Sequence, residues 1–234
     1  MEKSEMKATA ISTTMPLSHL VEQGIKTPED LLVYVARVSN PQNQLNTETG
    51  AGLIRYCIRN RHWSVFETNS VTVEIEVPRD IGRQILRHRS FQFQELSQRY
   101  TDPRQSVGFT VREARLQDSK NRQNSIYTDD ESLKSLWEQI QGDVINEADR
   151  AYQWAIDNGI AKECARVVLP EGNTMSRMYI TSNLRNFITY IALREKSGTQ
   201  AEHMQIARMI KGEICKIFPV VSAALGDVDT PWVI

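Results

Sequence analysis

Residues 71–77 read Val-Thr-Val-Glu-Ile-Glu-Val, and this run decides the fold class. Its β-branched apolar residues alternate with polar ones, which is the pattern of a strand with one buried face. Pro78 follows directly, and a proline cannot donate to a strand ladder. The sequence therefore predicts a half-buried strand that ends at Pro78.

Other extended segments are expected on both sides of this strand. They cover residues 7–14, 90–99, 109–115 and 174–180. Residues 119–129 are mostly polar, and we expect them to form a surface loop.

Helices are expected between and after these strands. Thr27-Pro28-Glu29-Asp30 predicts a helix start, because threonine caps, proline suits the first helical position and acids favour the first turn. The longest predicted helix spans residues 131–158, where apolar residues recur at three- and four-residue steps before Gly159 ends it. The other predicted helices cover residues 49–60, 81–87, 162–168, 182–193 and 199–217.

The order of these elements indicates the fold class. Strands and helices do not alternate regularly enough for a doubly wound sheet. We expect an α+β fold with an antiparallel sheet flanked by long helices, in a single domain over residues 1–234.

Charge and cysteine usage limit the possible functions. The formal net charge is −1, so the whole chain is not an electrostatic binder of nucleic acid. Cys57, Cys164 and Cys215 form no CxxC pair, which argues against a zinc site or a disulfide framework and fits a reducing compartment. The sequence shows neither a secretory signal nor a membrane-length apolar run. We therefore expect a cytoplasmic protein that binds no nucleic acid, membrane or metal.

Positive charge is concentrated between residues 79 and 104. This stretch holds six arginines against three acidic residues, which gives a local charge of +3. Arginine forks bind phosphates and planar heterocycle edges through paired hydrogen bonds. The segment is either a small-anion site or a solvated basic face, and its detailed order favours the anion site.

The order of residues 95–99 indicates a nucleotide. In an extended chain, Glu95, Ser97 and Arg99 project to the same side, because successive side chains alternate. An acceptor, a hydroxyl and a cation on one face suit the base edge, sugar and phosphate of a small nucleotide. Phe91 and Phe93 would share that face unless a bulge intervenes.

The same segment resembles the signature of flavin-dependent thymidylate synthases. That signature is Arg-His-Arg, seven residues and then Ser, and here it runs from Arg87 to Ser97 and continues through Tyr100. Other segments resemble the family in the same order: Ala-Arg-Val-Ser at 36–39, His-Trp-Ser-Val-Phe-Glu at 62–67, Ala-Arg-Val-Val-Leu-Pro at 165–170, Asn-Leu-Arg at 183–185 and Leu-Arg at 193–194. The resemblance covers about residues 30–210.

The resemblance implies roles for individual residues. The implied FAD contacts are His62, Ser64, Glu67, Arg87, His88, Arg89, Glu95, Asn183, Arg185 and Thr189. The implied dUMP contacts are Gln84, Arg87, Glu95, Leu96, Ser97, Gln98, Arg99, Arg166 and Arg194. Arg194 is the implied catalytic residue, because a guanidinium beside uracil stabilises the N3 anion and raises the nucleophilicity of C5. The chain departs from many relatives at two positions. Where this chain has Thr189, many relatives have Asn or His, and where it has Gly198, many have His.

The resemblance also implies the reaction and its participants. The reaction is the reductive methylation of dUMP to dTMP, with methylenetetrahydrofolate as carbon donor and NADPH-reduced FAD as hydride donor. No cysteine nucleophile is required, and no Gly-x-Gly-x-x-Gly turn follows a strand to hold the dinucleotide. The family's homotetramer, with active sites shared between subunits, is implied as well.

Three residues have simple structural interpretations, and two other functions stay open. We expect Cys164 to be a buried packing residue, His203 to be structural, and the flanking arginines to lower the pKa of His88 by like-charge repulsion. One alternative function is an RNA-binding module that uses the arginine-rich strand. The other is a different flavoprotein on the same scaffold, or a relative that binds FAD and dUMP without turnover.

Overall fold

The computed structural model describes residues 4–226 and 228–234. Its central element is a four-stranded antiparallel sheet in the order β1-β2-β6-β3. The strands are β1 (Lys7–Thr13), β2 (Ser70–Pro78), β6 (Met175–Asn183) and β3 (Gln92–Glu95). β2 and β6 pair along their full lengths, so the strand predicted at residues 71–77 lies at the centre of the sheet.

One face of the sheet is apolar and the other is polar. Val73 and Ile75 of β2 and Ile180 of β6 are 0% exposed. On the opposite face, Arg177 Nε donates a hydrogen bond to Glu76 Oε1 at 2.8 Å. This is the arrangement that the alternation of apolar and polar residues predicts.

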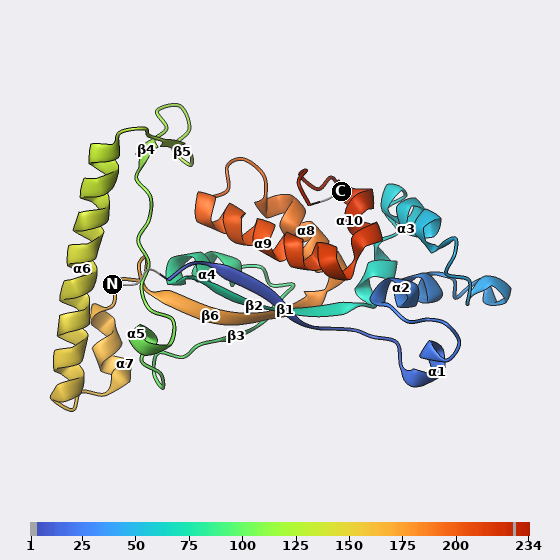
Figure 1. Cartoon of the computed structure of the whole chain (residues 1–234), viewed down its shortest axis with the longest axis horizontal. Helices are drawn as coiled ribbons and strands as arrows, with labels where there is room; N and C mark the ends of the chain where they lie inside the picture. Colours follow the sequence, from blue (N-terminus) through green and yellow to red (C-terminus); the bar gives the residue numbers. More distant parts are fainter. Residues whose placement is uncertain (1–3, 227) are drawn as a thin grey trace.

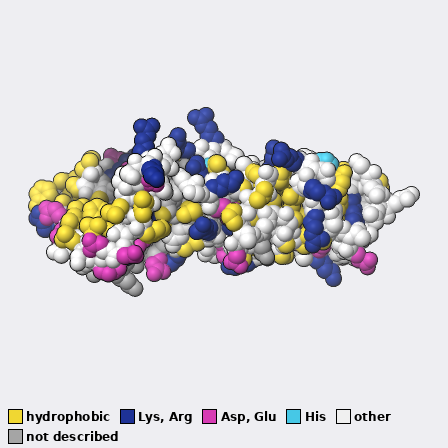
Figure 2. All heavy atoms as spheres, turned by 90° about the horizontal axis from the view of Figure 1, so that it is seen from above, with side chains coloured by type: hydrophobic (Ala, Val, Ile, Leu, Met, Phe, Trp, Pro, Cys, Tyr) yellow, Lys and Arg dark blue, Asp and Glu magenta, His cyan; other side chains and the backbone are white. Residues whose placement is uncertain are grey.

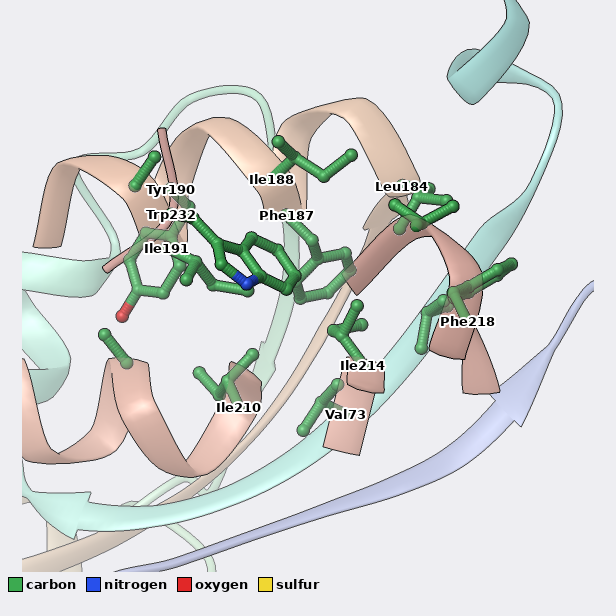
Figure 3. Packing of buried hydrophobic residues seen from close by; sticks show 14 of the residues in the cluster. Val73, Leu184, Phe187, Ile188, Tyr190, Ile191, Ile210, Ile214, Phe218 and Trp232 are labelled. Carbon is green, nitrogen blue, oxygen red and sulfur yellow. The ribbon is translucent and has the colours of Figure 1, made fainter. Parts of the chain in front are cut away.

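Helices cover the apolar face (Figure 1). The two that run along it are α8 (Leu184–Arg194) and α9 (Ala201–Ile217), and the remaining helices of this layer are α2 (Pro28–Ala36), α3 (Gly50–Arg59), α4 (Arg79–Ile85) and α10 (Pro219–Leu225). Figure 3 shows Phe187, Ile210, Ile214 and Trp232 packed together between α8, α9 and the C-terminal residues.

α2 begins as its sequence predicts. The Thr27 hydroxyl accepts a hydrogen bond from the Asp30 backbone N–H at 3.0 Å. The Asp30 carboxylate in turn accepts from the Thr27 N–H at 2.9 Å. These two bonds satisfy helix-start donors that have no partner within the helix.

The long helix α6 (Glu131–Asp157) stands at one end of the sheet (Figure 1) and is fastened partly by polar contacts. The Gln141 side chain accepts from the Arg112 N–H at 2.8 Å and donates to the Arg112 carbonyl at 2.9 Å. Arg104, on α5 (Pro103–Ser106), donates to Asp149 at 3.0 Å, and its guanidinium lies 4.5 Å from the centre of the Tyr152 ring. α7 (Lys162–Ala165) and η3 (Arg166–Val168) pack against the same helix.

Only part of the apolar stripe of α6 is covered. Ile145 and Tyr152 are 0% exposed, whereas Leu136, Trp137 and Trp154 are 54, 41 and 60% exposed. Gly159 follows the helix with a φ of 75°, a left-handed conformation that glycine adopts without strain. The apolar periodicity predicted this helix correctly. It did not indicate which apolar side chains of the helix remain exposed in the folded chain.

Some segments differ from the sequence-based expectation. Residues 109–115 do not form the predicted strand. Phe109 makes a single antiparallel bridge to Thr174, and strand pairing begins again only at Arg115, the first residue of β4. The predicted loop at 119–129 contains a strand of the hairpin β4 (Arg115–Gln117) and β5 (Ser125–Tyr127). The Asp118 carboxylate shapes the hairpin turn by accepting from the Lys120 and Asn121 N–H groups at 2.8 and 3.1 Å. The short elements α1 (Ser18–Val21), η1 (Pro41–Asn43), η2 (Trp63–Glu67) and α10 were not predicted.

Within the described residues, no helix combines the length and the apolar character needed to cross a membrane.

Candidate active site

Arg194 and His88 form the centre of the candidate active site. Arg194 is the last residue of α8, and His88 lies in the turn after α4. Arg194 Nε donates a hydrogen bond to His88 Nε2 at 2.9 Å. Burial, together with the nearby charge of Arg194, lowers the pKa of His88 to about 4. The imidazole is therefore neutral at pH 7, accepts this bond and orients the guanidinium.

The lowered pKa of His88 has the expected direction but not the expected cause. The sequence points to Arg87 and Arg89, whereas the structure assigns the shift first to burial and then to Arg194. The His88 ring lies edge-on to the Tyr190 ring, with centroids 4.9 Å apart. Aromatic neighbours shield this ring from water, while the side chains of Arg87 and Arg89 are exposed.

A chain of polar side chains lies beside the Arg194–His88 pair. The His203 ring is 0% exposed and its Nδ1 lies 3.1 Å from Gln84 Oε1, so Nδ1 carries the proton because an amide oxygen only accepts. Gln84 Nε2 donates to Gln200 Oε1 at 2.7 Å, and Gln200 Nε2 donates to Glu202 at 2.9 Å. Arg115 of the hairpin pairs with the same carboxylate at 2.6 Å. His203 is therefore a hydrogen-bonded core residue, as expected.

Two buried atoms of this cluster have no partner within the described residues. They are the Tyr190 hydroxyl oxygen and His203 Nε2. The two rings lie 5.9 Å apart, and burial raises the pKa of Tyr190. The sequence reading missed Tyr190 because it lies within the apolar stripe of α8, where a tyrosine resembles ordinary core packing.

The two buried histidines predict how stability depends on pH. The pKa values of His88 and His203 lie at about 4 and about 3, below the ordinary value of 6.5. Below pH 6.5 the unfolded chain therefore binds more protons than the folded chain, and the free energy of unfolding falls as pH drops toward 4. Thermal unfolding between pH 4.5 and 7.5 should show a lower Tm at acid pH, with a smaller slope in His203→Gln. The matched control is exposed His19→Gln, and an equal slope in all three proteins contradicts the prediction.

The residues expected to contact FAD, apart from Glu95, lie on η2, in the turn after α4 and at the junction of β6 with the first half of α8. η2 packs against α8, and Arg185 forms an ion pair with Glu67. The Ser90 carbonyl accepts from Ser182 Oγ at 2.7 Å and from Asn186 Nδ2 at 3.2 Å, which joins the turn after α4 to the same helix end. The expected FAD contacts carried by these segments are His62, Ser64, Glu67, Arg87, His88, Arg89, Asn183, Arg185 and Thr189.

These segments fit a dinucleotide phosphate group. Arg87 and Arg89 are exposed, and their side chains form no hydrogen bond or ion pair within the part of the chain that the structure describes. Asn183 caps α8 by accepting from the Asn186 N–H at 3.0 Å. Two unpaired arginines beside a positive helix end suit a pyrophosphate without a glycine-rich turn.

Glu95 lies in a different group from the other expected FAD contacts. Its carboxylate pairs with Arg79 and with Arg83, both at 3.2 Å, and accepts from Ser176 Oγ at 3.0 Å. These partners lie on α4 and β6 and fix Glu95 at the end of β3. The geometry therefore places Glu95 with the expected dUMP contacts.

The chain turns directly after β3. The Ser97 carbonyl accepts from the Tyr100 and Thr101 N–H groups at 3.1 and 3.0 Å. The expectation that Glu95, Ser97 and Arg99 share one face of an extended strand is therefore wrong. The last sheet bond of this segment is from the Leu96 N–H to the Arg177 carbonyl at 2.9 Å, and beyond it local turn bonds replace the ladder.

The expected dUMP contacts form two groups. Gln84, Arg87 and Arg194 lie near His88, whereas the second group comprises Glu95, Leu96, Ser97, Gln98, Arg99 and Arg166. Gln98 is 5% exposed and its side-chain nitrogen has no partner within the described residues. Within the described residues, no hydrogen bond or ion pair joins Arg194 to the second group. The two groups meet at α4, where Gln84 of the first group is next to Arg83, which bonds to Glu95 of the second.

Ion pairs break the continuity of the arginine-rich segment. Four of its six arginines pair with carboxylates: Arg79, Arg83, Arg99 and Arg104. An extended RNA-binding surface needs a continuous positive field. The pairing therefore counts against the RNA-binding alternative.

Cys164 is exposed, so its expected role as a buried packing residue is wrong. It lines an apolar cavity of about 460 Å³ between α6, α7 and η3, together with Trp154 and Val167. The residues around Cys164 are apolar, as expected, but no other part of the described chain covers the surface that they form.

The two positions expected to depart from many relatives, Thr189 and Gly198, lie on a helix face and in a turn. Thr189 Oγ1 donates to the Arg185 carbonyl one turn earlier at 3.0 Å, on the exposed side of α8. Gly198 has a φ of 92° between α8 and α9. A residue with a side chain is strained in that conformation, so this turn favours glycine.

Comparisons with known proteins identify the family. Residues 19–220 match the family described as thymidylate synthase complementing protein. The chain belongs to this family. A probable flavin-dependent thymidylate synthase of Paramecium bursaria Chlorella virus 1 is 44% identical over 94% of the chain and 99% of that relative. The flavin-dependent thymidylate synthase of Synechocystis sp. is 43% identical over the same shares.

A solved structure of similar shape supports the same family assignment. A UMP/dUMP methylase, PolB, from Streptomyces cacaoi, bound with 5-Br dUMP, superposes with a TM-score of 0.77. It is 27% identical and the match covers 95% of each chain. The α+β fold of this family member, with its antiparallel sheet, is therefore the one predicted from the sequence.

Proposed function

We propose that this chain is a flavin-dependent thymidylate synthase, which methylates dUMP to dTMP. FAD is the cofactor, methylenetetrahydrofolate the carbon donor and NADPH the reductant. The observation that carries the proposal is Arg194, whose guanidinium is held by neutral His88 at the end of α8. The relatives described above bear the same activity in their names.

Arg194 acts on the uracil ring. Its Nε is engaged by His88, and its remaining N–H groups make no hydrogen bond within the described residues. Facing N3 of uracil, these donors stabilise the N3 anion and so increase the electron density at C5, where the new carbon is attached. Neutral His88 keeps the guanidinium in place without adding a competing positive charge.

The second group of residues binds the rest of dUMP. Arg166 and Arg99 supply guanidinium groups for the phosphate, and Ser97 supplies a hydroxyl. Arg99 pairs with Glu163 at 3.1 Å, but both side chains are about half exposed, and such a pair yields readily to a dianion. Glu95, Leu96, Gln98, Gln84 and Arg87 complete the proposed contacts.

The first half of α8 holds FAD. Arg87, Arg89 and the N-terminus of α8 bind its phosphates, and the other contacts are His62, Ser64, Glu67, His88, Asn183, Arg185 and Thr189. When bound, FAD supplies the hydride that completes the methyl group. The side chains of this site contribute orientation, positive charge and exclusion of water.

The ion pair between Arg185 and Glu67 gives the first test of the FAD site. Arg185→Ala is expected to raise the Kd for FAD about tenfold, because it removes a charged hydrogen-bond donor and frees η2 from α8. Flavin fluorescence during titration of the FAD-free protein measures this Kd. Lys216→Ala is the matched control, since Lys216 also pairs with a glutamate but lies at the C-terminal end of α9. Equal Kd values for the parent and Arg185→Ala rule out this placement of FAD.

The uncovered side of α6 supports a homotetramer. Figure 2 shows hydrophobic side chains gathered at the end of the molecule that carries α6. Trp154 is 60% and Val167 84% exposed, beside the apolar cavity between α6, α7 and η3. Exposed apolar surface of this kind marks a protein interface. Arg166 is the neighbour of Val167 in η3, so a subunit contact at this surface would lie next to a proposed dUMP contact. This is consistent with active sites shared between subunits.

Two further expectations belong to the proposal. Residues 1–234 are expected to act as a single domain: the main hydrophobic cluster joins elements from α2 to Trp232, and α6, which has a small cluster of its own with α7, is bonded to the rest through Gln141 and Asp149. We expect the compartment to be the cytoplasm, because the cysteine spacing in the sequence shows no CxxC pair and no disulfide framework, which fits a reducing environment.

The visible spectrum of the purified protein tests the proposal. The protein should bind FAD, and dUMP should perturb the flavin absorbance band near ~450 nm, because substrate and cofactor share one site. A protein that takes up no FAD is not a flavin-dependent synthase. A protein that binds FAD and dUMP but makes no dTMP is the non-catalytic relative.

A further inference from the structure

The C-terminal residues 228–234, called the tail here, fold back onto α8 and α9. Gly226 reverses the chain with a φ of 133°, and the Val233 N–H donates to the Leu225 carbonyl at 3.1 Å. Trp232 is 0% exposed and lies in the core beside Phe187 and Ile210 (Figure 3). The tail is therefore anchored by an indole that the main hydrophobic core encloses.

The anchored tail completes a buried ion pair. Lys211 Nζ of α9 lies 2.9 Å from Glu195 Oε2, and the two side chains are 1 and 3% exposed. Lys211 Nζ also donates to the Thr230 carbonyl at 2.6 Å, and the Trp232 N–H donates to Glu195 Oε1. Lys211 Nζ lies 5.4 Å from the centre of the Trp232 ring. Each member of the pair thus has one bond to the other member and one to the tail backbone.

This ion pair depends on the tail. Two charges taken out of water are tolerated only when further hydrogen bonds satisfy their remaining donors and acceptors. Without the tail, Glu195 loses the Trp232 N–H and Lys211 loses the Thr230 carbonyl. Water that replaces the tail would then solvate both charges, and the pair would no longer hold Glu195 in its position at the end of α8.

The pair lies next to the proposed catalytic residue. Glu195 follows Arg194 directly and caps α8, with its N–H bonded to the Ile191 carbonyl at 3.0 Å. Arg194 is therefore held from two sides, by His88 at its side chain and by Glu195 at its backbone. A movement of Glu195 displaces the guanidinium relative to His88.

We propose that the tail is a positioning element for Arg194, and that it acts through Trp232, Lys211 and Glu195. These three are positioning residues, since the ion pair is buried and acts on the site through the backbone of α8. This inference rests on the proposed function of Arg194. It predicts that the tail sets the binding of the uracil ring and leaves the binding of FAD unchanged.

Kinetics of tail variants test this proposal. Truncation after Asp229 and Trp232→Ala should each raise the KM for dUMP about tenfold and lower kcat by a similar factor, because small displacements of a catalytic group are costly. The Kd for FAD should stay within about twofold of the parent. Trp232→Phe, which keeps an aromatic anchor and the backbone N–H, should restore most of the activity. Lys211→Gln replaces the truncation if the shortened chain does not fold.

Phe218→Ala is the matched control for lost core packing. Phe218 is 0% exposed in the same hydrophobic cluster, and the bonds that join Lys211 and Glu195 to each other and to the tail do not involve its side chain. It should lower the Tm as much as Trp232→Ala does, with the KM for dUMP unchanged. A KM that rises equally in both variants, or in neither, overturns the proposal.

Hydrogen exchange provides a readout that needs no turnover. In the truncated chain, amides of residues 190–197 should exchange faster than in the parent, and Phe218→Ala should not show this local change. If the parent makes no dTMP, the proposed function fails, and the exchange result still decides whether the tail holds the end of α8. Unchanged exchange at residues 190–197 contradicts the positioning role.

Discussion

Replacing Arg194 by alanine is expected to lower the rate of dTMP formation about 10²- to 10³-fold, because it removes the donors that stabilise the developing negative charge on uracil. FAD should remain bound, since the proposed FAD contacts lie on η2, the turn after α4 and the first half of α8. The measurement is dTMP formation under saturating FAD and reductant, with the flavin spectrum recorded in the same sample.

Two variants sharpen this test. Arg194→Lys keeps the charge but not the planar fork, so it should recover only a small part of the lost rate. His88→Gln keeps an acceptor for Arg194 Nε and should lose much less activity than Arg194→Ala. A rate within tenfold of the parent in Arg194→Ala would show that another group stabilises the anion.

Placing glutamates at Trp154 and Val167 together is expected to abolish dTMP formation by dissociating the subunits. Two buried, unpaired carboxylates cost an interface several kcal/mol, about enough to raise the dissociation constant 10³-fold or more. Under the proposed arrangement of shared sites, separated subunits then lack residues that a neighbouring copy contributes to the site. Light scattering gives the molar mass, and the dTMP assay is run at the same protein concentration.

The control for this test is Val38→Glu. Val38 is 68% exposed and lies in the turn after α2, and Figure 1 shows α2 and α6 at opposite ends of the molecule. This variant should keep both the mass and the activity of the parent. A double variant that is monomeric but fully active would mean that each chain contains a complete site.

The sequence predicted the elements that depend on local pattern. The strand at 71–77, the cap at Thr27 and the helix ending before Gly159 follow from alternation, side-chain capping and left-handed backbone geometry. The residues from Arg87 to Ser97 were proposed as site residues because their spacing resembles the signature of the family. These features need no knowledge of distant parts of the chain.

Features that depend on distant contacts were not predictable in the same way. The pKa of His88 is set by burial under α8 and by Arg194, which lies 106 residues later in the sequence. The turn at Ser97 replaces an extended strand because pairing with β6 stops at Glu95. Cys164 occupies an apolar helix face whose exposure depends on whether another subunit covers it. The burial of Lys211 and Glu195 depends on the tail, which encloses them, and no local pattern indicates it.

The most direct test is anaerobic turnover. The purified protein, loaded with FAD, is mixed with dUMP, methylenetetrahydrofolate and NADPH without oxygen, and dTMP and folate products are separated by chromatography. The account predicts dTMP together with tetrahydrofolate, because the hydride comes from the flavin and the folate is not oxidised. Oxidation of NADPH without dTMP, or dTMP accompanied by dihydrofolate, would contradict it.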